Sequence, residues 1–445
     1  MSVITAVLEK IFPSISFNDD IVDRIDLFKQ WLIMVGAYLL IFALFIHGYQ
    51  YYLATTWRYL GYYWHPDLGR FIESLTAILI IATFLPKKFK KPSDILLHIH
   101  FLFPVLPMLV INAAMEVPKP FTFLAVALFL MIVIVNKFRL FRPLGHFSLS
   151  GDLLQQFTFA WVVGVVMLFI AVGGLSHINF DLALIYDTRG DASSWKPGFF
   201  NYLTPMTTKV ILPFALILSV VKRRWLCLFG ILFCSVLLFG FTNHKAVFFH
   251  PYAVLFLFFL LHRKRVINKL LMCFTGLLLF IQGLHLALGE IAELLVSMFL
   301  RRVFFIPALI NYHFHEFFTQ NAHTFWANNT FTLGMVKKLY TLNGAHTIGY
   351  YYFKNPETSA NTGWIGSGYM QAGYWGMVIY AVIIALIFNF ADTLAINRKK
   401  EIVTAGIVIP FLAMFSASDL PTSLLTHGLL VALMFVTLLP RNSEL

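Results

Sequence analysis

The sequence predicts an all-α fold: a polytopic integral membrane bundle of about twelve transmembrane helices that forms a single domain over residues 1–445. Hydrophobic residues make up 59% of the chain and charged residues only 12%. Apolar runs of about 20 residues, enough to span a bilayer as helices, recur from Trp31 to Leu439. Between these runs, lysine and arginine residues gather in short clusters, which is typical of the connections between membrane spans.

The apolar runs place the helices in order along the chain. They predict spans near residues 30–48, 71–86, 94–113, 121–135, 155–175, 204–221, 225–241, 249–262, 270–288, 370–390, 402–416 and 423–439. No repeat with a period of 20 to 50 residues is visible, and no two halves contain matching broken helices of the kind that transporters use. One helical bundle is therefore expected.

The distribution of positive charge predicts which side of the membrane each connection faces. With the amino terminus inside, the connections after the even-numbered helices hold seventeen lysine and arginine residues, against eleven in the longer connections on the other side. Because cytoplasmic loops are enriched in these residues, both termini are expected in the cytoplasm. Membrane topology thus accounts for the net charge of +12, and no nucleic-acid partner is expected.

Two outer connections, 176–203 and 289–369, are long and polar. The second contains Arg301 and Arg302, where the positive-inside tendency disfavours them, on a helix expected to lie along the membrane surface. A guanidinium group binds phosphate oxygens through two hydrogen bonds, so this pair is the leading candidate for contact with a diphosphate; contact with lipid phosphates is the alternative. Arg189 and Lys245 are further candidates, although neighbouring aspartates could neutralise Arg189 and lipid phosphates could hold Lys245.

Histidine residues of the second loop are candidates for acid–base chemistry rather than for a metal site. His313 and His315 are two residues apart, so their side chains diverge on a helix. The chain has no Asp-x-Asp motif, the usual means by which a sugar-nucleotide transferase holds a divalent ion. No metal and no other cofactor is therefore expected. The candidates for a general base are His323, His313, Glu290, Glu316 and Glu357, and the sequence does not choose between them.

Aromatic and glycine residues mark two further segments. Tyrosines and tryptophans between residues 49 and 64 are interpreted as an interfacial belt, with stacking on sugar rings as the alternative. From Asn355 to Met377 the chain contains NPETSANTGWIGSGYMQAGYWGM, where the second loop re-enters the membrane. The glycines of this motif allow close approach of neighbouring backbones: Gly363, Gly366, Gly368, Gly373 and Gly376.

Three other segments accompany this motif: LRRVFFIPAL at 300–309, GFTNHKAVFFHPYAVLFLF at 240–258 and NKFRLFRPLG at 136–145. Together the four segments resemble the Wzy O-antigen polymerases of Gram-negative bacteria, notably the pseudomonad type. The resemblance covers roughly residues 131–390. It implies a GT-C-like enzyme of the inner membrane with two large periplasmic loops, which joins oligosaccharide repeat units carried on undecaprenyl diphosphate. Membrane lipid and the Wzz chain-length regulator are the other partners that it implies.

The resemblance also implies roles for individual residues. Arg301 and Arg302 resemble the arginines of the second loop, Arg189 that of the first and Lys245 the basic residue between helices seven and eight. The resulting expectation is a metal-independent glycosyltransferase with Arg301, Arg302 and His323 as catalytic residues. Arg189, Lys245, Tyr312, His313 and Asn361 are expected to bind substrate. In the implied chemistry, the cations stabilise the departing lipid diphosphate while a base activates the incoming hydroxyl.

Two other functions remain open at this point. An O-antigen ligase would move the finished glycan from undecaprenyl diphosphate to lipid A-core, so it shares the donor chemistry and differs in the acceptor. A transporter or flippase of lipid-linked oligosaccharide would also need about twelve helices, but it predicts charges at the middle of the membrane. Most ionisable residues lie at the edges of the predicted spans, with Glu73 and Asp419 as exceptions, which favours an enzyme.

Overall fold

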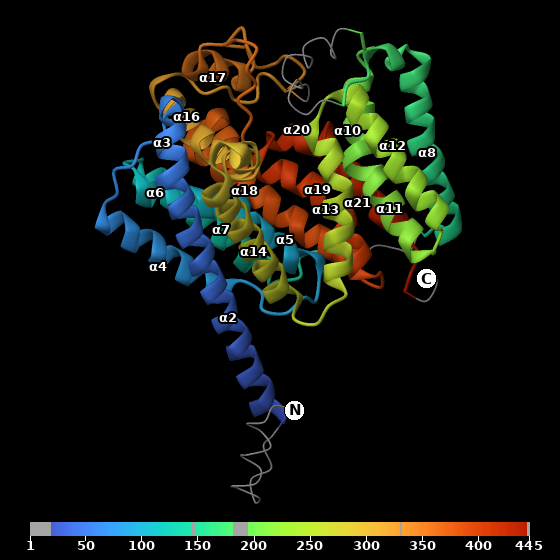
Figure 1. Ribbon diagram of the computed structural model, residues 1–445, viewed down its shortest axis with the longest axis horizontal. Coiled ribbons are helices and arrows are strands. Elements are labelled where there is room, and N and C mark those ends of the chain that lie inside the picture. The colour runs from blue at the N-terminus through green and yellow to red at the C-terminus, as the bar shows by residue number, and fades with distance from the viewer. Residues whose placement is uncertain (1–18, 144–147, 181–194, 330–331, 443–445) are drawn as a thin grey trace, which may run out of the picture.

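The protein is described from a computed structural model, which defines residues 19–143, 148–180, 195–329 and 332–442; side chains are described from residue 24 on. These residues form helices and no strand, as predicted. The first part of the bundle holds α2 (Asp19–Gly48), α3 (Ala54–Thr56), α4 (Leu68–Phe84), α5 (Pro92–His100), α6 (Leu106–Ala114) and α7 (Lys119–Val135) (Figure 1).

The chain then continues through α8 (Gly151–Ala171), α10 (Phe200–Met206), α11 (Leu212–Val221), α12 (Trp225–Thr242), α13 (Lys245–Leu261) and α14 (Val266–Leu288). The last part holds α15 (Glu293–Val296), α16 (Ile306–Gln320), α17 (Gly344–Phe353), α18 (Trp364–Leu394), α19 (Lys400–Ser416), α20 (Leu420–Leu425) and α21 (Leu429–Leu438). Tight or wide helical turns join several of them: η1 (Tyr49–Leu53), η2 (Arg58–Leu60), η3 (Phe101–Val105), η4 (Gly174–His177), η5 (Thr207–Ile211), η6 (Gly289–Ala292) and η7 (Ser297–Phe305).

Eight helical stretches in the described chain are long and apolar enough to cross a membrane: Arg24–Thr56, Pro92–Ala114, Gly151–Ala171, Phe200–Val221, Trp225–Thr242, Val266–Gln320, Trp364–Leu394 and Leu420–Leu438. The polytopic membrane character predicted from the sequence therefore holds. Four other predicted spans coincide with α4, α7, α13 and α19, each of 17 residues. At 1.5 Å per residue each is about 26 Å long, slightly less than the roughly 30 Å of a bilayer core.

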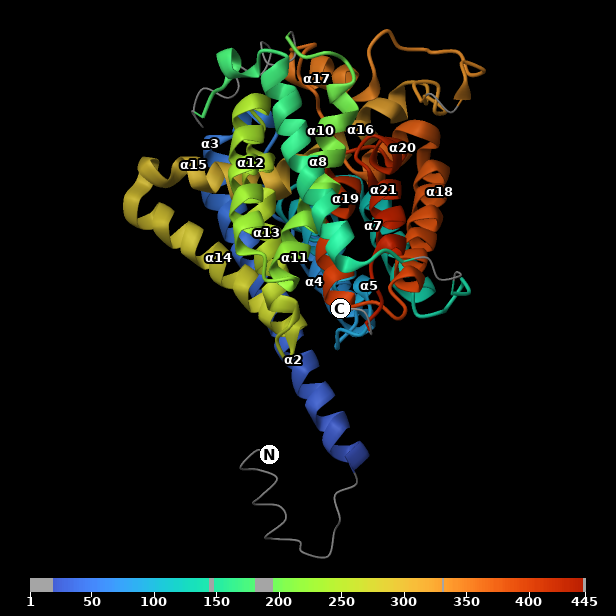
Figure 2. The ribbon, with the colours of Figure 1, turned by 90° about the vertical axis from the view of Figure 1, so that its right-hand side faces the viewer.

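The centre of the bundle is the stretch Pro92–Ala114, in which every residue except Phe103 is buried. A helix that is apolar on all sides is stable only when other helices surround it. Here α18 and α19 pack against α5, while α4 and α7 pack against α6. The first residues of α2 and the last of α21 lie at one end of the bundle, and α17 lies at the other, in both views (Figures 1 and 2).

Much of the range 289–369, expected as a loop, is helical, with α15, η7, α16 and α17 inside it. Pro307 lies in the first turn of α16, directly after the wide helical turns of η7. The apolar residues Leu309, Phe314 and Phe317 are buried as α16 packs against α18 and α6. Histidines and other polar residues interrupt this apolar pattern, so the sequence did not distinguish a partly buried helix from a loop.

The predicted close approach of glycine backbones is confirmed at the start of α18. A Cβ on Gly363 would lie 1.9 Å from the carbonyl oxygen of Phe415 in α19, and one on Gly366 would lie 2.8 Å from the Asn311 Oδ1 of α16. Further along, a Cβ on Gly376 would lie 2.0 Å from the Gly368 carbonyl oxygen, across the break within α18 itself. Side chains at Gly363 and Gly366 would push α18 away from α19 and α16, and one at Gly376 would disturb the break in α18.

The helix α18 is broken at Ala372 and Gly373, where Gly373 adopts a φ of +61°. Such a break frees backbone carbonyl groups that must find other donors. The Thr324 and Phe325 amides supply them, donating to the carbonyls of Met370 and Gln371 at 3.0 and 2.9 Å. The segment that follows α16 is thereby held against the break in α18.

Asp419 fixes the same break from the other side. Its carboxylate accepts hydrogen bonds from Gln371 Nε2 at 3.0 Å, from the Tyr380 hydroxyl at 2.7 Å and from the Leu420 amide at 2.9 Å. We expect Asp419→Asn to lower the free energy of unfolding by about 1–3 kcal/mol, because the new amide group cannot accept from all three donors. Thermal unfolding of the purified protein measures this loss. Glu357→Gln, the same change at an exposed site, should leave the unfolding temperature unchanged.

Candidate functional site

Arg301 is the one buried lysine or arginine among the described residues: it is only 5% exposed although it carries a permanent charge. It lies in η7, where the helix widens just before α16. One turn earlier, the Ser297 hydroxyl accepts hydrogen bonds from Arg301 Nε at 3.0 Å and from a terminal nitrogen at 2.7 Å. This geometry holds the guanidinium group in one orientation.

The remaining contacts of Arg301 come from the connection between α2 and α4. The Trp57 ring lies over the guanidinium group, with its centroid 3.5 Å from the central carbon, a cation–π contact worth up to about 2 kcal/mol when desolvated. Tyr52 and Tyr62, both buried, are close enough to interact with Arg301 electrostatically. The Tyr62 hydroxyl has no hydrogen-bond partner among the described residues. This segment reaches Arg301 through η1, η2 and a left-handed turn at Gly61, with φ +100°.

Arg302 follows Arg301 in the chain, and Lys245 lies close to Arg302. Lys245 begins α13 after a tight turn in which Asn243 adopts a φ of +53°. Burial lowers the pKa of the Lys245 ammonium, and the neighbouring Arg302 guanidinium lowers it further. Arg302 likewise acts on Arg301 electrostatically. We call these three residues the cation centre: two predicted catalytic residues adjoin each other, and one predicted substrate-binding residue lies close to Arg302.

No carboxylate forms an ion pair with Arg301 within the described ranges, where its partners are the Ser297 hydroxyl and the Trp57 ring. Removing a charge from water is costly unless a counter-charge or several hydrogen bonds compensate for it. The like charge on Arg302 increases this cost. The cation centre is therefore suited to accept an anion, which would supply the missing counter-charge.

His313 lies further along α16, in a second group of polar side chains. Its ring stacks on Tyr352 of α17 with centroids 4.0 Å apart, and the Tyr352 hydroxyl donates to Glu316 Oε2 at 2.9 Å. The buried Nε2 of His313 has no partner among the residues that the structure describes. Gly61, in the connection that covers Arg301, lies against the same ring. His313 and Arg301 thus share one neighbouring segment.

His323 lies beyond the end of α16, against the break in α18. A Cβ on Gly373 would be 3.1 Å from its Nε2, so glycine makes room for the ring there. Burial lowers the pKa of His323, although hydrogen bonds to the carbonyls of Met370 and Tyr369 act in the opposite direction. Its Nδ1 has no partner in the described part of the chain. His323 is therefore neutral at pH 7 and retains a nitrogen that can accept a proton.

The structure does not bring His323 to the cation centre. Arg301 precedes α16 and His323 follows it, and the 15 residues of α16 span about 22 Å. At the far end of α16, Thr319 lies 2.9 Å from the Tyr369 hydroxyl, and His323 packs on that same tyrosine. The three residues expected to be catalytic therefore occupy two places, and one reacting bond cannot touch both.

The other candidate residues lie apart from these two places. The Tyr312 hydroxyl is buried, 2.8 Å from Thr122 Oγ1, and donates to the Met108 carbonyl at 3.2 Å, so its polar atom is used in packing α16. Asn361 is exposed in the turn before α18. Arg189 lies outside the described residues.

Sequence reasoning missed the closest neighbours of Arg301. The contact between Ser297 and Arg301 could have been predicted, because residues four apart on a helix are neighbours. Trp57, Tyr52 and Tyr62 were interpreted as part of an interfacial belt, because no spacing rule relates them to a residue so distant in the sequence. In the structure, Tyr52 and Tyr62 are buried inside the protein, whereas Tyr59 and Tyr63 are exposed.

No protein-family model matches the chain, and no curated protein or solved structure is significantly similar to it. The geometry of the cation centre and of the His323 region, together with the motifs described above, is thus the basis for a proposal of function.

Proposed function

We propose that the protein is a Wzy-type O-antigen polymerase, a metal-independent glycosyltransferase that joins oligosaccharide repeat units carried on undecaprenyl diphosphate. The observation that carries this proposal is the cation centre: a buried arginine that lacks a carboxylate partner among the described residues, with Arg302 next to it and Lys245 close to Arg302. A diphosphate is the anion that best fits several cations and a fixed guanidinium group. The sequence motifs supply the sugar and lipid parts of the proposed substrate.

The location of the site in the bundle supports activity at the periplasmic face of the inner membrane. The start of α2 and the end of α21 lie at one end of the bundle, together with most of the positively charged connections (Figures 1 and 2). The positive-inside tendency assigns that end to the cytoplasm. The helix α17 lies at the opposite end, and this arrangement supports a periplasmic location for the cation centre.

The separation of Arg301 from His323 refines the proposed roles. Both substrates of a polymerase carry a diphosphate, but the reacting hydroxyl of the acceptor lies at the other end of its oligosaccharide. The cation centre therefore holds the diphosphate of the acceptor, and the oligosaccharide extends along α16. The hydroxyl then reaches His323, the proposed general base, where it attacks the anomeric carbon of the donor and the donor's lipid diphosphate departs.

Steady-state kinetics of the purified protein with lipid-linked repeat units test these roles. Arg301→Ala should mainly raise the KM for the acceptor, because acceptor binding is lost, whereas His323→Gln should mainly lower kcat, by roughly 10²- to 10⁴-fold. A large fall in kcat for Arg301→Ala with an unchanged acceptor KM would instead assign the cation centre to the leaving group of the donor. Absence of polymer with the wild-type protein would contradict the polymerase assignment.

The pH dependence of kcat provides a further prediction. Because burial lowers the folded-state pKa of His323 below the usual value of about 6.5, the neutral base persists somewhat below that pH. We expect kcat to be constant near pH 7 and to decrease as the pH falls through this lowered pKa. A pH–rate profile measures the decrease. A half-maximal point above 6.5, or the same acidic limb in His323→Gln, would exclude His323 as the base.

A further inference from the structure

A second charged region lies at the opposite end of the bundle from α17, where three connections meet: α4 to α5, α13 to α14 and α18 to α19 (Figures 1 and 2). Three adjoining cavities of about 650, 610 and 300 Å³ open there. Lys90 and Lys91 line the first two, Lys87 and Lys88 line the second and third, and Lys400 lines the first and third. We call the three cavities together the basic basin.

The basic basin has a large excess of positive charge. Five lysine or arginine side chains and two carboxylates line the largest cavity. In the second cavity the numbers are five and one, and in the third they are six and one. Cations held around a concave surface raise the local potential more than the same charges on an open surface. The chemistry of the lining therefore selects for anions.

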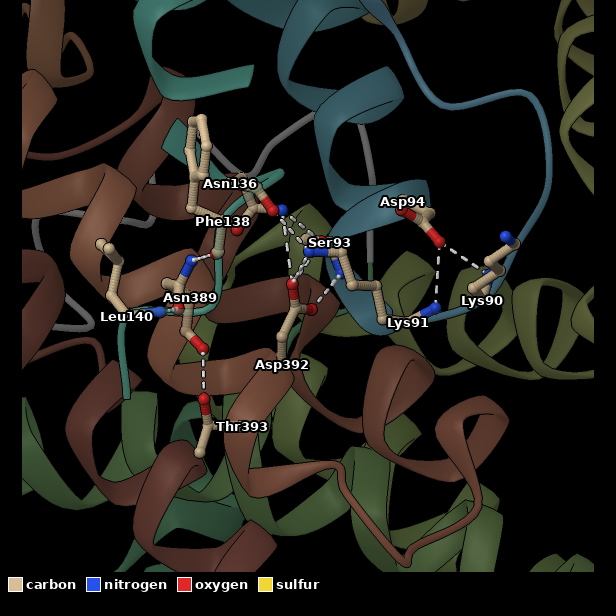
Figure 3. A network of polar contacts seen from close by, with 10 residues as sticks. All are labelled: Lys90, Lys91, Ser93, Asp94, Asn136, Phe138, Leu140, Asn389, Asp392 and Thr393. Carbon is tan, nitrogen blue, oxygen red and sulfur yellow. Dashed lines mark hydrogen bonds and ion pairs between the residues drawn. The ribbon is translucent and has the colours of Figure 1, made fainter. Parts of the chain in front are cut away.

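Asp392, the most buried carboxylate of the largest cavity's lining, serves the structure of the protein itself (Figure 3). It forms an ion pair with Lys91 Nζ at 2.8 Å and accepts hydrogen bonds from the Ser93 amide at 2.9 Å and the Ser93 hydroxyl at 2.6 Å. Asn136 donates to it at 3.3 Å. Its charge is thus used to fix the start of α5, and the other cations of the basin outnumber the two remaining carboxylates, Asp94 and Glu401.

The walls of the basic basin are fixed by hydrogen bonds to the backbone. Arg398 donates to the carbonyls of Leu394 and Thr437, each at 2.7 Å, and so joins the ends of α18 and α21. Lys400 Nζ donates to the Phe89 carbonyl at 2.9 Å and lies 4.7 Å from the centroid of the Phe89 ring, which joins α19 to the connection before α5. These two cations are therefore held in place before any ligand binds, which reduces the entropic cost of binding.

The depth of the basic basin indicates which anion it meets. It lies where three candidate membrane spans end, at Pro92, Leu394 and Leu438. The ends of spans lie at the level of lipid headgroups, and basic pockets between membrane helices on the cytoplasmic side bind anionic headgroups. We propose that the basic basin binds the phosphate of an anionic phospholipid headgroup. This proposal does not depend on the function proposed above.

Lipid-dependent thermal unfolding of the full-length protein in detergent tests the proposal. Phosphatidylglycerol should raise the unfolding temperature, whereas phosphatidylcholine, which has the same phosphate but no net charge, should not. Lys90→Gln combined with Lys399→Gln should weaken the apparent affinity for phosphatidylglycerol at least tenfold. Both lysines line the largest cavity, and the hydrogen bond that Lys90 makes to Asp94 uses its backbone amide, so the double variant is expected to fold.

Lys337→Gln combined with Lys338→Gln is the matched control, because both lysines are exposed in the connection between α16 and α17 and the same charge is removed. This variant should respond to phosphatidylglycerol as the wild type does. Equal stabilisation by both lipids, or equal loss in both double variants, would overturn the proposal. Inorganic pyrophosphate is the soluble probe: stabilisation by pyrophosphate but not by phosphatidylglycerol would assign the basin to a soluble phosphate and would refute the lipid assignment.

Discussion

Replacing Arg301 with alanine is expected to abolish detectable O-antigen polymer while the protein is still inserted in the membrane at normal levels. The guanidinium group is buried and fixed by Ser297 and Trp57, so no other side chain can take its position. Truncating one partner of a buried, hydrogen-bonded charge pair costs about 2–5 kcal/mol of binding, or roughly 30- to several thousand-fold. The lipopolysaccharide banding pattern of a deletion strain complemented with the variant measures this loss.

Two further variants separate a lost contact from a lost fold. Arg301→Lys keeps the charge but cannot form two parallel hydrogen bonds to a phosphate, so we expect only partial recovery of polymer. Lys337→Ala removes an exposed cation that lies outside the cation centre and should leave the banding pattern unchanged. Polymer of wild-type length from Arg301→Ala would contradict a role for the cation centre in binding the acceptor.

Replacing Gly363 with alanine is expected to have the largest effect on folding. The added methyl group would lie 1.9 Å from the Phe415 carbonyl oxygen, a backbone atom that cannot rotate away, so α18 and α19 must separate. Overpacking of this kind costs about 1–3 kcal/mol, and the very short contact places this variant at the upper end. The amount of protein in the membrane and its unfolding temperature in detergent both measure the effect.

Gly276→Ala is the matched control for Gly363→Ala. Gly276 lies inside α14, and no atom lies within 4 Å of the position that its Cβ would occupy. Alanine favours a helix over glycine by up to about 1 kcal/mol, so this variant should be as stable as the wild type or slightly more stable. If both variants unfold at the same temperature, the close packing of α18 against α19 does not limit stability.

The sequence predicted the helical membrane fold because apolar runs and charge clusters are local properties that can be seen along the chain. The close approach at Gly363 and Gly366 was also predictable, since glycine has few other reasons to recur in a membrane helix. The helix α16 was missed because its buried face is interrupted by histidines. Short helices such as α7, at 17 residues, explain why twelve predicted spans correspond to eight long apolar helical stretches in the described residues.

The candidate site was predictable only in part. Arg301, Arg302 and Lys245 were singled out individually because cations on the outer side of a membrane protein are unusual, and the structure brings Lys245 close to Arg302. The contact between Trp57 and Arg301 depends on how α2 and η7 pack, which no local pattern encodes. For the same reason the sequence did not reveal that α16 separates His323 from Arg301.

The lipopolysaccharide banding pattern after deletion of the gene in the source organism distinguishes the three functions considered. A polymerase is required only to extend the first repeat, so we predict that the ladder collapses to core carrying a single repeat unit. Loss of every repeat would indicate a ligase or a flippase instead. An unchanged ladder would contradict a role for this protein in O-antigen assembly.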